Sequence, residues 1–152
     1  MDDAGLMTFE AWIAKVLACL NPAERQGMFR AVTQELLKRN RSRITRQISP
    51  EGTAWAPRKR DRHGQVRKKA KMMVGLRAAR RLKGTTAPEG SEVGWSGRDA
   101  GIALVHQHGE RDHIDRRKSA AKVRYPVRTL IGLPDADKDA VRAIILERFS
   151  HL

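Results

Sequence analysis

The sequence predicts an α+β fold: a small antiparallel sheet with flanking helices, an N-terminal helical pair and a C-terminal helix. Three observations predict this class. Apolar residues recur every three or four positions near both ends of the chain, which is the helical period. Around position 125 they alternate with polar residues, as in a strand with one buried face. Glycine and proline separate these stretches.

The length of 152 residues predicts a single domain over 1–152. Within it we expect the helical pair over 1–48 and a loop over 49–65. The segment 66–152 is expected to hold a third helix, the strands and the C-terminal helix.

The helical pair consists of a first helix from Thr8 to Leu20 and a second that begins at Pro22. The start of the second helix is better defined than the start of the first. Asn21 can cap the helix, Pro22 suits its first position, and Glu24 completes a capping box. Pro50 is expected to stop this helix, because proline cannot continue the hydrogen-bond ladder.

Ser49, Pro50 and Gly52 fit the positions of a type I turn. After a charged loop, a third helix is predicted from Val66 to Leu82, and Gly84 suits its C-terminal cap. The residues expected to point inward from this helix are Met72, Met73, Leu76 and Ala79. Those expected to point outward are Arg77, Arg80, Arg81 and Lys83.

Strand character is predicted at Val93 and Trp95, and a short helix is predicted from about Ile102 to Gly109. The strongest strand signal spans Val123 to Ile131, and Pro126 makes this strand an edge or a bulge. The residues on one face of this strand are Val123, Tyr125, Val127, Thr129 and Ile131, and those on the other face are Arg124, Pro126 and Arg128. Pro134 opens the last helix, whose buried residues are Val141, Ile144, Ile145 and Phe149.

Positive charge is concentrated in the middle of the chain. The net charge is +14, and 38–83 holds 17 Lys and Arg against two acids, a net +15, so that the remainder carries −1. Such a block attracts polyanions, either nucleic acid or an acidic face of a protein partner. The alternative is a solvated surface that keeps the protein soluble.

The candidate residues for binding a partner or polyanion are Arg58, Lys59, Arg60, Arg77, Arg80 and Arg81. Trp55 is the only aromatic residue from Lys38 to Lys83. Any contact with nucleic acid is therefore expected to be directed at phosphates and blind to base sequence.

Trp55 and Trp95 are candidate assembly or packing anchors. Tryptophan is enriched at interface hot spots, but it also fills gaps in a core, and the sequence leaves both roles open. For Trp55, flanked by Pro50, Gly52 and Pro57, we favour a rigid corner that packs on the protein's own sheet.

No catalytic motif is present: the sequence has no Walker loop, no nucleophile elbow and no dinucleotide-binding fingerprint. His106, His108 and His113 lie near acidic residues, and imidazole and carboxylate bind zinc, but their spacing matches no helical metal-binding pair. Cys19 is interpreted as a small core residue. We expect no enzyme, no metal and no cofactor; a metal-dependent hydrolase remains the third alternative.

The sequence also bears on location. No apolar run approaches the roughly 20 residues of a membrane span. The single cysteine fits a reducing cytoplasm, and Met1-Asp2-Asp3 lacks the basic region of a signal peptide. We therefore expect synthesis in a cytoplasm and no contact with a membrane.

Four segments carry a family resemblance. The first runs from Arg43 to Arg58 and contains SPEGTAWAPR; the others are Lys71 to Arg80, Val93 to Gly109, and Tyr125 to Asp137. In this order they resemble the phage virion morphogenesis proteins, the tail completion family of contractile-tailed phages. Together they span most of the chain. The sequence departs from the family pattern at His108, where an aromatic residue is common, and in the charged segment 112–122.

The resemblance implies a structural protein of the virion, made in the bacterial host cytoplasm and located in the tail or neck. It implies that the protein completes the tail at its head-proximal end and takes part in head–tail joining. It also implies a homo-oligomeric ring, with six copies to match the tail, and contacts with tail tube, sheath and head–tail connector proteins. The alternative is a small basic nucleic-acid-binding protein without a tail role. An infectious phage and a phage-derived bactericidal particle both fit the sequence.

Overall fold

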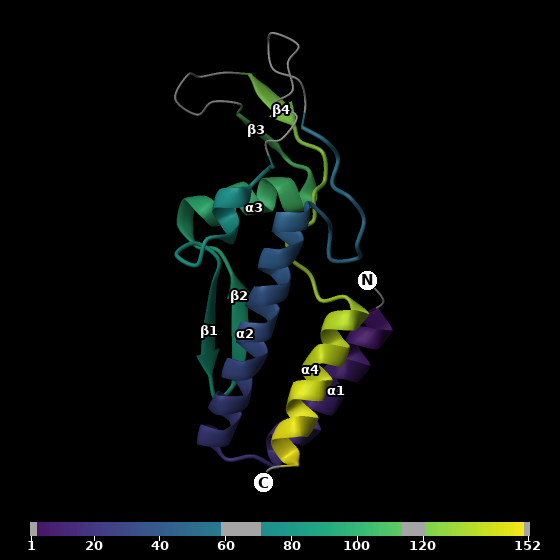
Figure 1. The fold of residues 1–152 in the computed structure, drawn as a ribbon, viewed down its shortest axis with the longest axis vertical. Helices are drawn as coiled ribbons and strands as arrows, with labels where there is room; N and C mark the ends of the chain where they lie inside the picture. The colour runs from purple at the N-terminus through teal and green to yellow at the C-terminus, as the bar shows by residue number, and fades with distance from the viewer. Residues whose placement is uncertain (1–2, 59–70, 114–120, 151–152) are drawn as a thin grey trace. The chain divides into compact units, whose positions relative to one another are not determined.

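The computed structural model describes residues 3–58, 71–113 and 121–150 (Figure 1). They form helices and two small antiparallel two-stranded sheets, which confirms the α+β class. The elements are α1 (Asp3–Ala18), α2 (Pro22–Arg46), the 3-10 helix η1 (Val74–Arg77), β1 (Lys83–Ala87), β2 (Gly90–Gly94), α3 (Gly97–His108), β3 (Arg111–His113), β4 (Lys122–Arg124) and α4 (Asp135–Phe149).

The chain divides into two compact units. The first unit comprises Met1–Lys38, Gly84–Val93 and Leu133–Leu152, and the second comprises Arg39–Lys83 and Gly94–Gly132. Helix α2 contributes its first part to the first unit and its last turns to the second.

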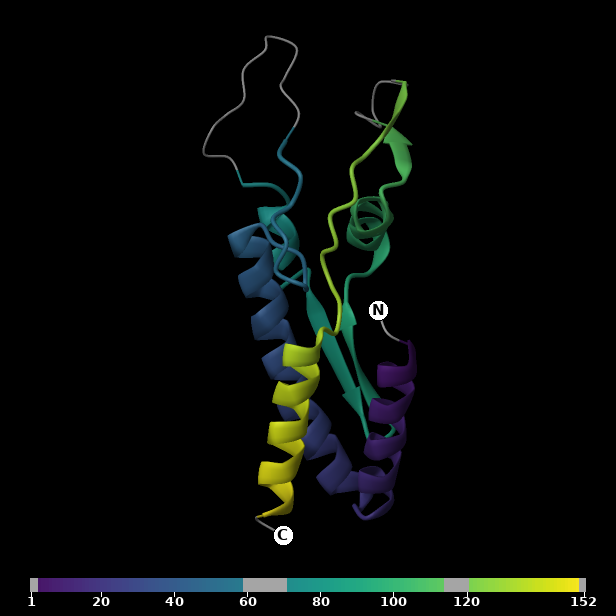
Figure 2. The same ribbon diagram turned by 90° about the vertical axis from the view of Figure 1, so that its right-hand side faces the viewer.

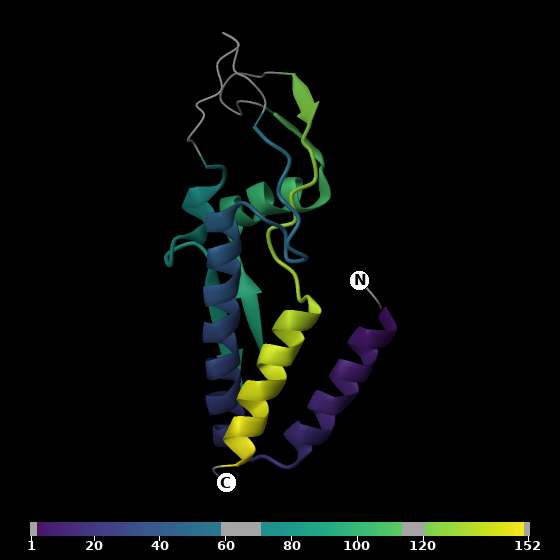
Figure 3. The ribbon, with the colours of Figure 1, turned by 45° about the vertical axis from the view of Figure 1, so that its right-hand side comes forward.

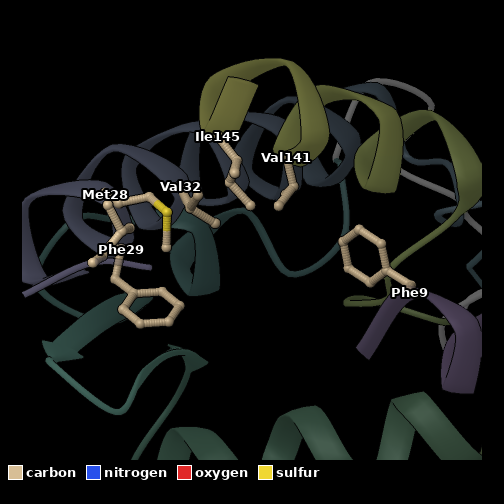
Figure 4. Close-up of a cluster of buried hydrophobic side chains, with 7 residues drawn as sticks. Phe9, Met28, Phe29, Val32, Val141 and Ile145 are labelled. Atoms are coloured by element: carbon tan, nitrogen blue, oxygen red, sulfur yellow. The ribbon is translucent and has the colours of Figure 1, made fainter. Parts of the chain in front are cut away.

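The first unit is built around α1, α2 and α4, whose apolar residues form one core. Phe9, Met28, Val32 and Ile145 are buried there, and Figure 4 shows them converging from the three helices. The remaining buried members are Leu20, Phe29 and Val141. Figure 3 shows α1 and α4 beside the first part of α2. Burial of this aliphatic and aromatic set is the main stabilising term of the unit.

The capping box at the start of α2 is confirmed. The backbone N–H of Glu24 donates to Asn21 Oδ1 at 3.0 Å, and the backbone N–H of Asn21 donates to Glu24 Oε2 at 2.9 Å. This reciprocal pair satisfies donors that the first helical turn leaves open.

The hairpin β1–β2 lies along the first part of α2 (Figure 1). Gly84 allows this close approach, because a Cβ at this position would collide with the methyl group of Thr33. The prediction that Gly84 caps a helix is therefore wrong: it belongs to β1. Val93 lies in β2 as predicted, whereas Trp95 follows the strand.

The second unit has its own core at the end of α2. Ile44, Trp55, Leu76 and Leu130 are buried together with Ala103 of α3. The chain then forms β3 and β4, which pair antiparallel with Asp112 opposite Val123. The predicted end of α3 at Gly109 is confirmed, with a left-handed φ of 65°, whereas the helix begins at Gly97 and not near Ile102.

The predicted helix from Val66 to Leu82 is wrong over its described part. Residues 71–82 contain only the four-residue helix η1, and 66–70 lie outside the described residues. The amide group of Gln47 binds both the backbone N–H and the C=O of Met72, and Met73 adopts a left-handed φ of 56°. These two features direct the backbone away from an α-helix before Val74.

The predicted strand Val123–Ile131 is also wrong beyond its first residues. Only Lys122–Arg124 pairs as a strand. The residues that follow, 125–131, have no strand partner and are called the extended segment. Figure 1 and Figure 2 show this extended segment passing α3. The predicted facing fails as well, since Val127 is 59% exposed while Arg128 and Leu130 are buried.

Smaller differences concern the first helices. Helix α1 begins at Asp3 rather than Thr8, and α2 ends at Arg46, where Gln47 takes a left-handed φ of 60°. Cys19 is exposed and not part of a core. Helix α4 begins after Pro134, as predicted. No helix within 3–58, 71–113 and 121–150 is both long and apolar enough to span a membrane.

Candidate functional site

The segment after α2 forms a tight corner that ends at Trp55. The backbone N–H of Gly52 donates to Ser49 O at 3.0 Å, which confirms the predicted turn. The backbone N–H of Trp55 donates to Gln47 O at 2.9 Å, so the chain returns to the end of the helix. Gly52 has a φ of 87°, a conformation that glycine adopts without strain.

Trp55 is buried by this return, with 7% of its surface exposed. Its ring packs among Ile44, Leu76 and Leu130, and its indole N–H donates to Thr129 O at 3.1 Å. The indole therefore packs on the end of α2 and on the extended segment, and the expectation that it packs on a sheet is wrong.

Arg128 holds the corner from the other side. Its Nε donates to Ala56 O at 2.9 Å and its Nη2 donates to Pro57 O at 3.1 Å. Only 4% of Arg128 is exposed, and burial lowers the pKa of its guanidinium. Trp55 and Arg128 thus join the corner to one extended segment through three side-chain bonds to backbone carbonyls.

Gln107 of α3 provides three further bonds to that segment. Its Oε1 accepts from Leu130 N at 2.7 Å and from Ile131 N at 3.2 Å, and its Nε2 donates to Ile131 O at 2.8 Å. A side-chain amide here replaces the backbone of a neighbouring strand. Gln47 acts in the same way towards Met72.

No local sequence pattern indicates these roles for Gln47, Gln107 or Arg128. Gln47 and Gln107 lie in the segments that carry the family resemblance, but nothing in their spacing indicates a bond to a distant backbone. Arg128 lay on the predicted outer face of a strand, where burial is not expected.

His106 lies next to Arg128, with its Nδ1 3.5 Å from Nη1 of the arginine. The ring of Tyr125 meets the imidazole edge-on, with centroids 5.0 Å apart. Burial and the charge of Arg128 lower the pKa of His106, while Asp112 acts in the opposite direction. A neutral imidazole is therefore the favoured form near neutral pH.

The histidines do not converge on a metal site in the described parts of the chain. His106 and His113 are half-buried and His108 is exposed. No three His, Cys, Asp or Glu side chains among the described residues are placed to hold a metal ion.

A pocket of about 480 Å³ opens beside His106 in the second unit. Its basic lining residues are Arg58, Lys71, Arg124 and Arg128. Its other lining residues are Met72, Met73, His106, Val123, Tyr125 and Pro126. No carboxylate is among the described residues that line the pocket. Basic and apolar side chains thus line the same pocket, a combination that suits an anionic group attached to an apolar one.

The predicted basic residues have different environments. Arg58 is exposed and lines the pocket. Arg77 and Arg80 are exposed, on and just after η1, whereas Arg81 lies 3.4 Å from Asp99 in an ion pair. Lys59 and Arg60 lie outside the described residues.

Trp95 is half-buried and packs in the same core as Trp55. Its indole N–H donates to Leu76 O at 2.8 Å. The structure thus brings the two candidate anchors into one core, while any role in assembly stays a prediction.

Comparison with known proteins relates the chain to phages. The model of the phage virion morphogenesis family matches residues 5–150. Tail completion protein S of Escherichia phage P2 is 31% identical over 143 residues, which cover 91% of this chain and 93% of the relative. No solved structure matches the chain. A family match over almost the whole length, with such a relative, shows that the chain belongs to the phage virion morphogenesis family.

Proposed function

We propose that the protein completes the phage tail at its head-proximal end and takes part in joining head to tail. The observation that carries this proposal is the 31% identity with a tail completion protein over nearly the whole of both chains. The corner at Trp55 and the extended segment both lie within stretches of sequence that resemble the family. We therefore assign the role to these two parts of the structure. The mechanism is structural: the protein binds neighbours, and no catalytic step is part of the proposal.

The proposed assembly is a homo-oligomeric ring, with six copies as the expected number because tails have that symmetry. One face would bind tail tube and sheath proteins, and the other would present a surface to the head–tail connector. A ring uses heterologous contacts whose rotation closes. Mass photometry of the purified protein at physiological salt is expected to show a species of six times 17.1 kDa. A strictly monomeric protein, also in the presence of purified tails, would contradict the ring.

The tail role is tested by a stop codon early in the gene of a producing phage or prophage. Electron microscopy of the lysate is expected to show filled heads and separate tails, and purified protein added to that lysate is expected to restore joined particles. Normal joined particles in the absence of the protein would overturn the proposal.

A second candidate function is sequence-independent binding of nucleic acid, favoured by the net charge of +14. The two functions differ in partner. A protein whose loss leaves assembly intact, and which binds DNA with steep salt dependence, would support this alternative.

A further inference from the structure

We propose that the pocket beside His106 binds an acidic segment of another virion protein, one that places an apolar side chain between carboxylates. The inference rests on the proposed tail function only for the source of that segment. The pocket itself lies wholly within the second unit and is lined by described residues.

The basic side chains around the pocket keep donors for a ligand. Arg124 uses Nε to donate to Gly109 O at 3.3 Å, and no described residue takes a bond from either of its Nη groups, which can therefore donate to a ligand. Lys71 is exposed and donates to Thr45 O at 2.7 Å, which positions its ammonium without neutralising it. Guanidinium groups bind carboxylates through paired N–H donors, and such charge-assisted bonds are among the strongest in proteins.

Part of the pocket lining is apolar and adaptable. It consists of Met72, Met73, Val123 and Pro126 and is called the floor below. Methionine side chains are flexible and polarizable, and they accept apolar groups of different shape. A phosphate chain has no group for this floor, whereas a Leu, Ile or Phe flanked by acids would use both the floor and the cations.

The aromatic residues argue against single-stranded nucleic acid as the occupant. Base binding of that kind needs an open aromatic face on which a base can stack. Tyr125 and His106 already contact each other edge-on, with an interplanar angle of 73°. We therefore assign the pocket to a peptide and treat nucleic acid as an outcome of the test.

The test uses three fluorescein-labelled probes and the purified full chain at 150 mM NaCl. The first probe is a peptide of ten Glu residues with one Leu at its centre. The second has Ser in place of Leu, and the third is a 20-nucleotide single-stranded DNA. Anisotropy is expected to show tighter binding of the Leu peptide than of the Ser peptide. Equal affinity for both peptides would show that the floor takes no part and would overturn the inference.

Two variants locate the site. Arg124→Glu and Arg58→Glu are each expected to weaken binding of the Leu peptide by about tenfold or more, a loss of roughly 1.4 kcal/mol. Arg98→Glu is the matched control, because Arg98 is exposed in the same unit, carries the same charge change and does not line the pocket. It is expected to weaken binding by no more than about twofold, as for an exposed charge away from the site. Circular dichroism confirms that each variant is folded.

Equal losses in the pocket variants and in Arg98→Glu would show general electrostatic attraction and would overturn the pocket. Tighter binding of the DNA probe, lost in Arg124→Glu, would assign the pocket to nucleic acid instead. The His106 Cε1–H resonance gives a readout at the site, since a carboxylate held there would raise the pKa of His106. Failure of peptide binding leaves the tail role standing, whereas normal phage assembly without the gene overturns the tail role and leaves the pocket measurement unaffected.

Discussion

Single side chains replace strand partners in the second unit. Gln107 holds Leu130 and Ile131 through three bonds, and Gln47 holds Met72 through two. Each bond satisfies a backbone group that a longer sheet would have paired. Residues 125–131 are held beside a strand of only three residues by the bonds of Gln107 together with backbone bonds from Tyr125 N to Glu110 O and from Arg128 N to His106 O.

Gln107→Ala is expected to destabilise the protein by about 1–3 kcal/mol, because buried backbone groups at Leu130 and Ile131 lose their partner. Urea denaturation measures the change. Gln34→Ala is the control: Gln34 is exposed on α2, and alanine favours the helix. Equal stability of the Gln107 variant and the wild type would show that the amide bonds contribute nothing net.

Trp55→Ala is expected to cost about 3–5 kcal/mol, since it removes a buried ring from the second core. Trp55→Phe keeps most of the packing and loses the bond to Thr129 O, so its expected cost is smaller, about 1 kcal/mol from the bond alone. Thermal unfolding checks both variants. An unchanged melting temperature for Trp55→Ala would contradict the packing role, and loss of oligomers from a folded Trp55→Phe variant would point to an assembly role.

His106 gives the protein a specific pH dependence. Its pKa is lowered in the folded state by burial and by Arg128, so the unfolded chain takes up the proton first as the pH falls. Stability is therefore expected to be complete above the ordinary histidine pKa of about 6.5 and to decline as the pH falls below it. Melting temperatures between pH 7.5 and 5.5 measure this decline. His106→Gln is expected to flatten it, and an equally steep decline in that variant would assign it to other groups.

At the scale of elements, the features that depend on neighbouring residues in the sequence were predicted. The capping box at Asn21, the end of α3 at Gly109 and the start of α4 after Pro134 are as predicted. The missed elements depend on bonds between distant parts of the chain. Met72 bonds to Gln47, and Arg128 bonds to Ala56 and Pro57. These partners are too far apart in the sequence for a local pattern to indicate the contact. The apolar character of 71–82 and the alternation after Val123 were real, but these contacts override both propensities.

The candidate site was predictable only in part, for the same reason. Arg58 was predicted from its place in a basic run, and it lines the pocket. Lys71, His106 and Arg124 come from other stretches of the chain, and only folding places them around one cavity. Arg81, a predicted partner-binding residue, forms an ion pair with Asp99, and its role in binding a partner stays a prediction.

Substitution by alanine is expected to change stability in opposite directions at Gly101, inside α3, and at Gly109, just after its end. Gly109 has a φ of 65°, and a Cβ there would lie 2.8 Å from Val127 Cγ2 and 3.1 Å from Tyr125 O. Gly109→Ala is therefore expected to destabilise by about 1–2 kcal/mol from the backbone alone, with the clash in addition. Gly101 has open space at its Cβ inside the helix, so Gly101→Ala is expected to stabilise by about 0.5–1 kcal/mol. Denaturant midpoints check the pair, and a shift of both in one direction would contradict the assignment of Gly109 as the required turn.

At the scale of the whole molecule, positive charge is concentrated in the second compact unit and is not limited to the basic block 38–83. The second unit holds 24 Lys and Arg against six acids, a net +18, and the first unit holds seven against 11, a net −4. The block 38–83 described only part of this, because 94–132 adds further positive charge to the second unit. The excess is far larger than the opposite charge of the first unit, so contacts between copies cannot neutralise it. Close assembly through the second unit is therefore expected to depend on a polyanionic or acidic partner or on counterions.

If the protein completes tails as proposed, docking onto purified tails is expected to weaken as salt rises from 50 to 500 mM, because exposed charges are screened within about 10 Å at 0.1 M. Arg77→Glu with Arg80→Glu is expected to abolish docking and leave the protein folded, since both side chains are exposed. Arg81 stays unchanged in this variant, because its reversal would place two acids together at Asp99.

Arg30→Glu with Arg148→Glu is the control: it makes the same charge change in the first unit and is expected to dock normally. Cosedimentation with tails measures both variants. Normal docking by the Arg77 and Arg80 variant would show that these charges form only a solvated surface, whereas equal loss in both variants would assign docking to net charge and not to the second unit.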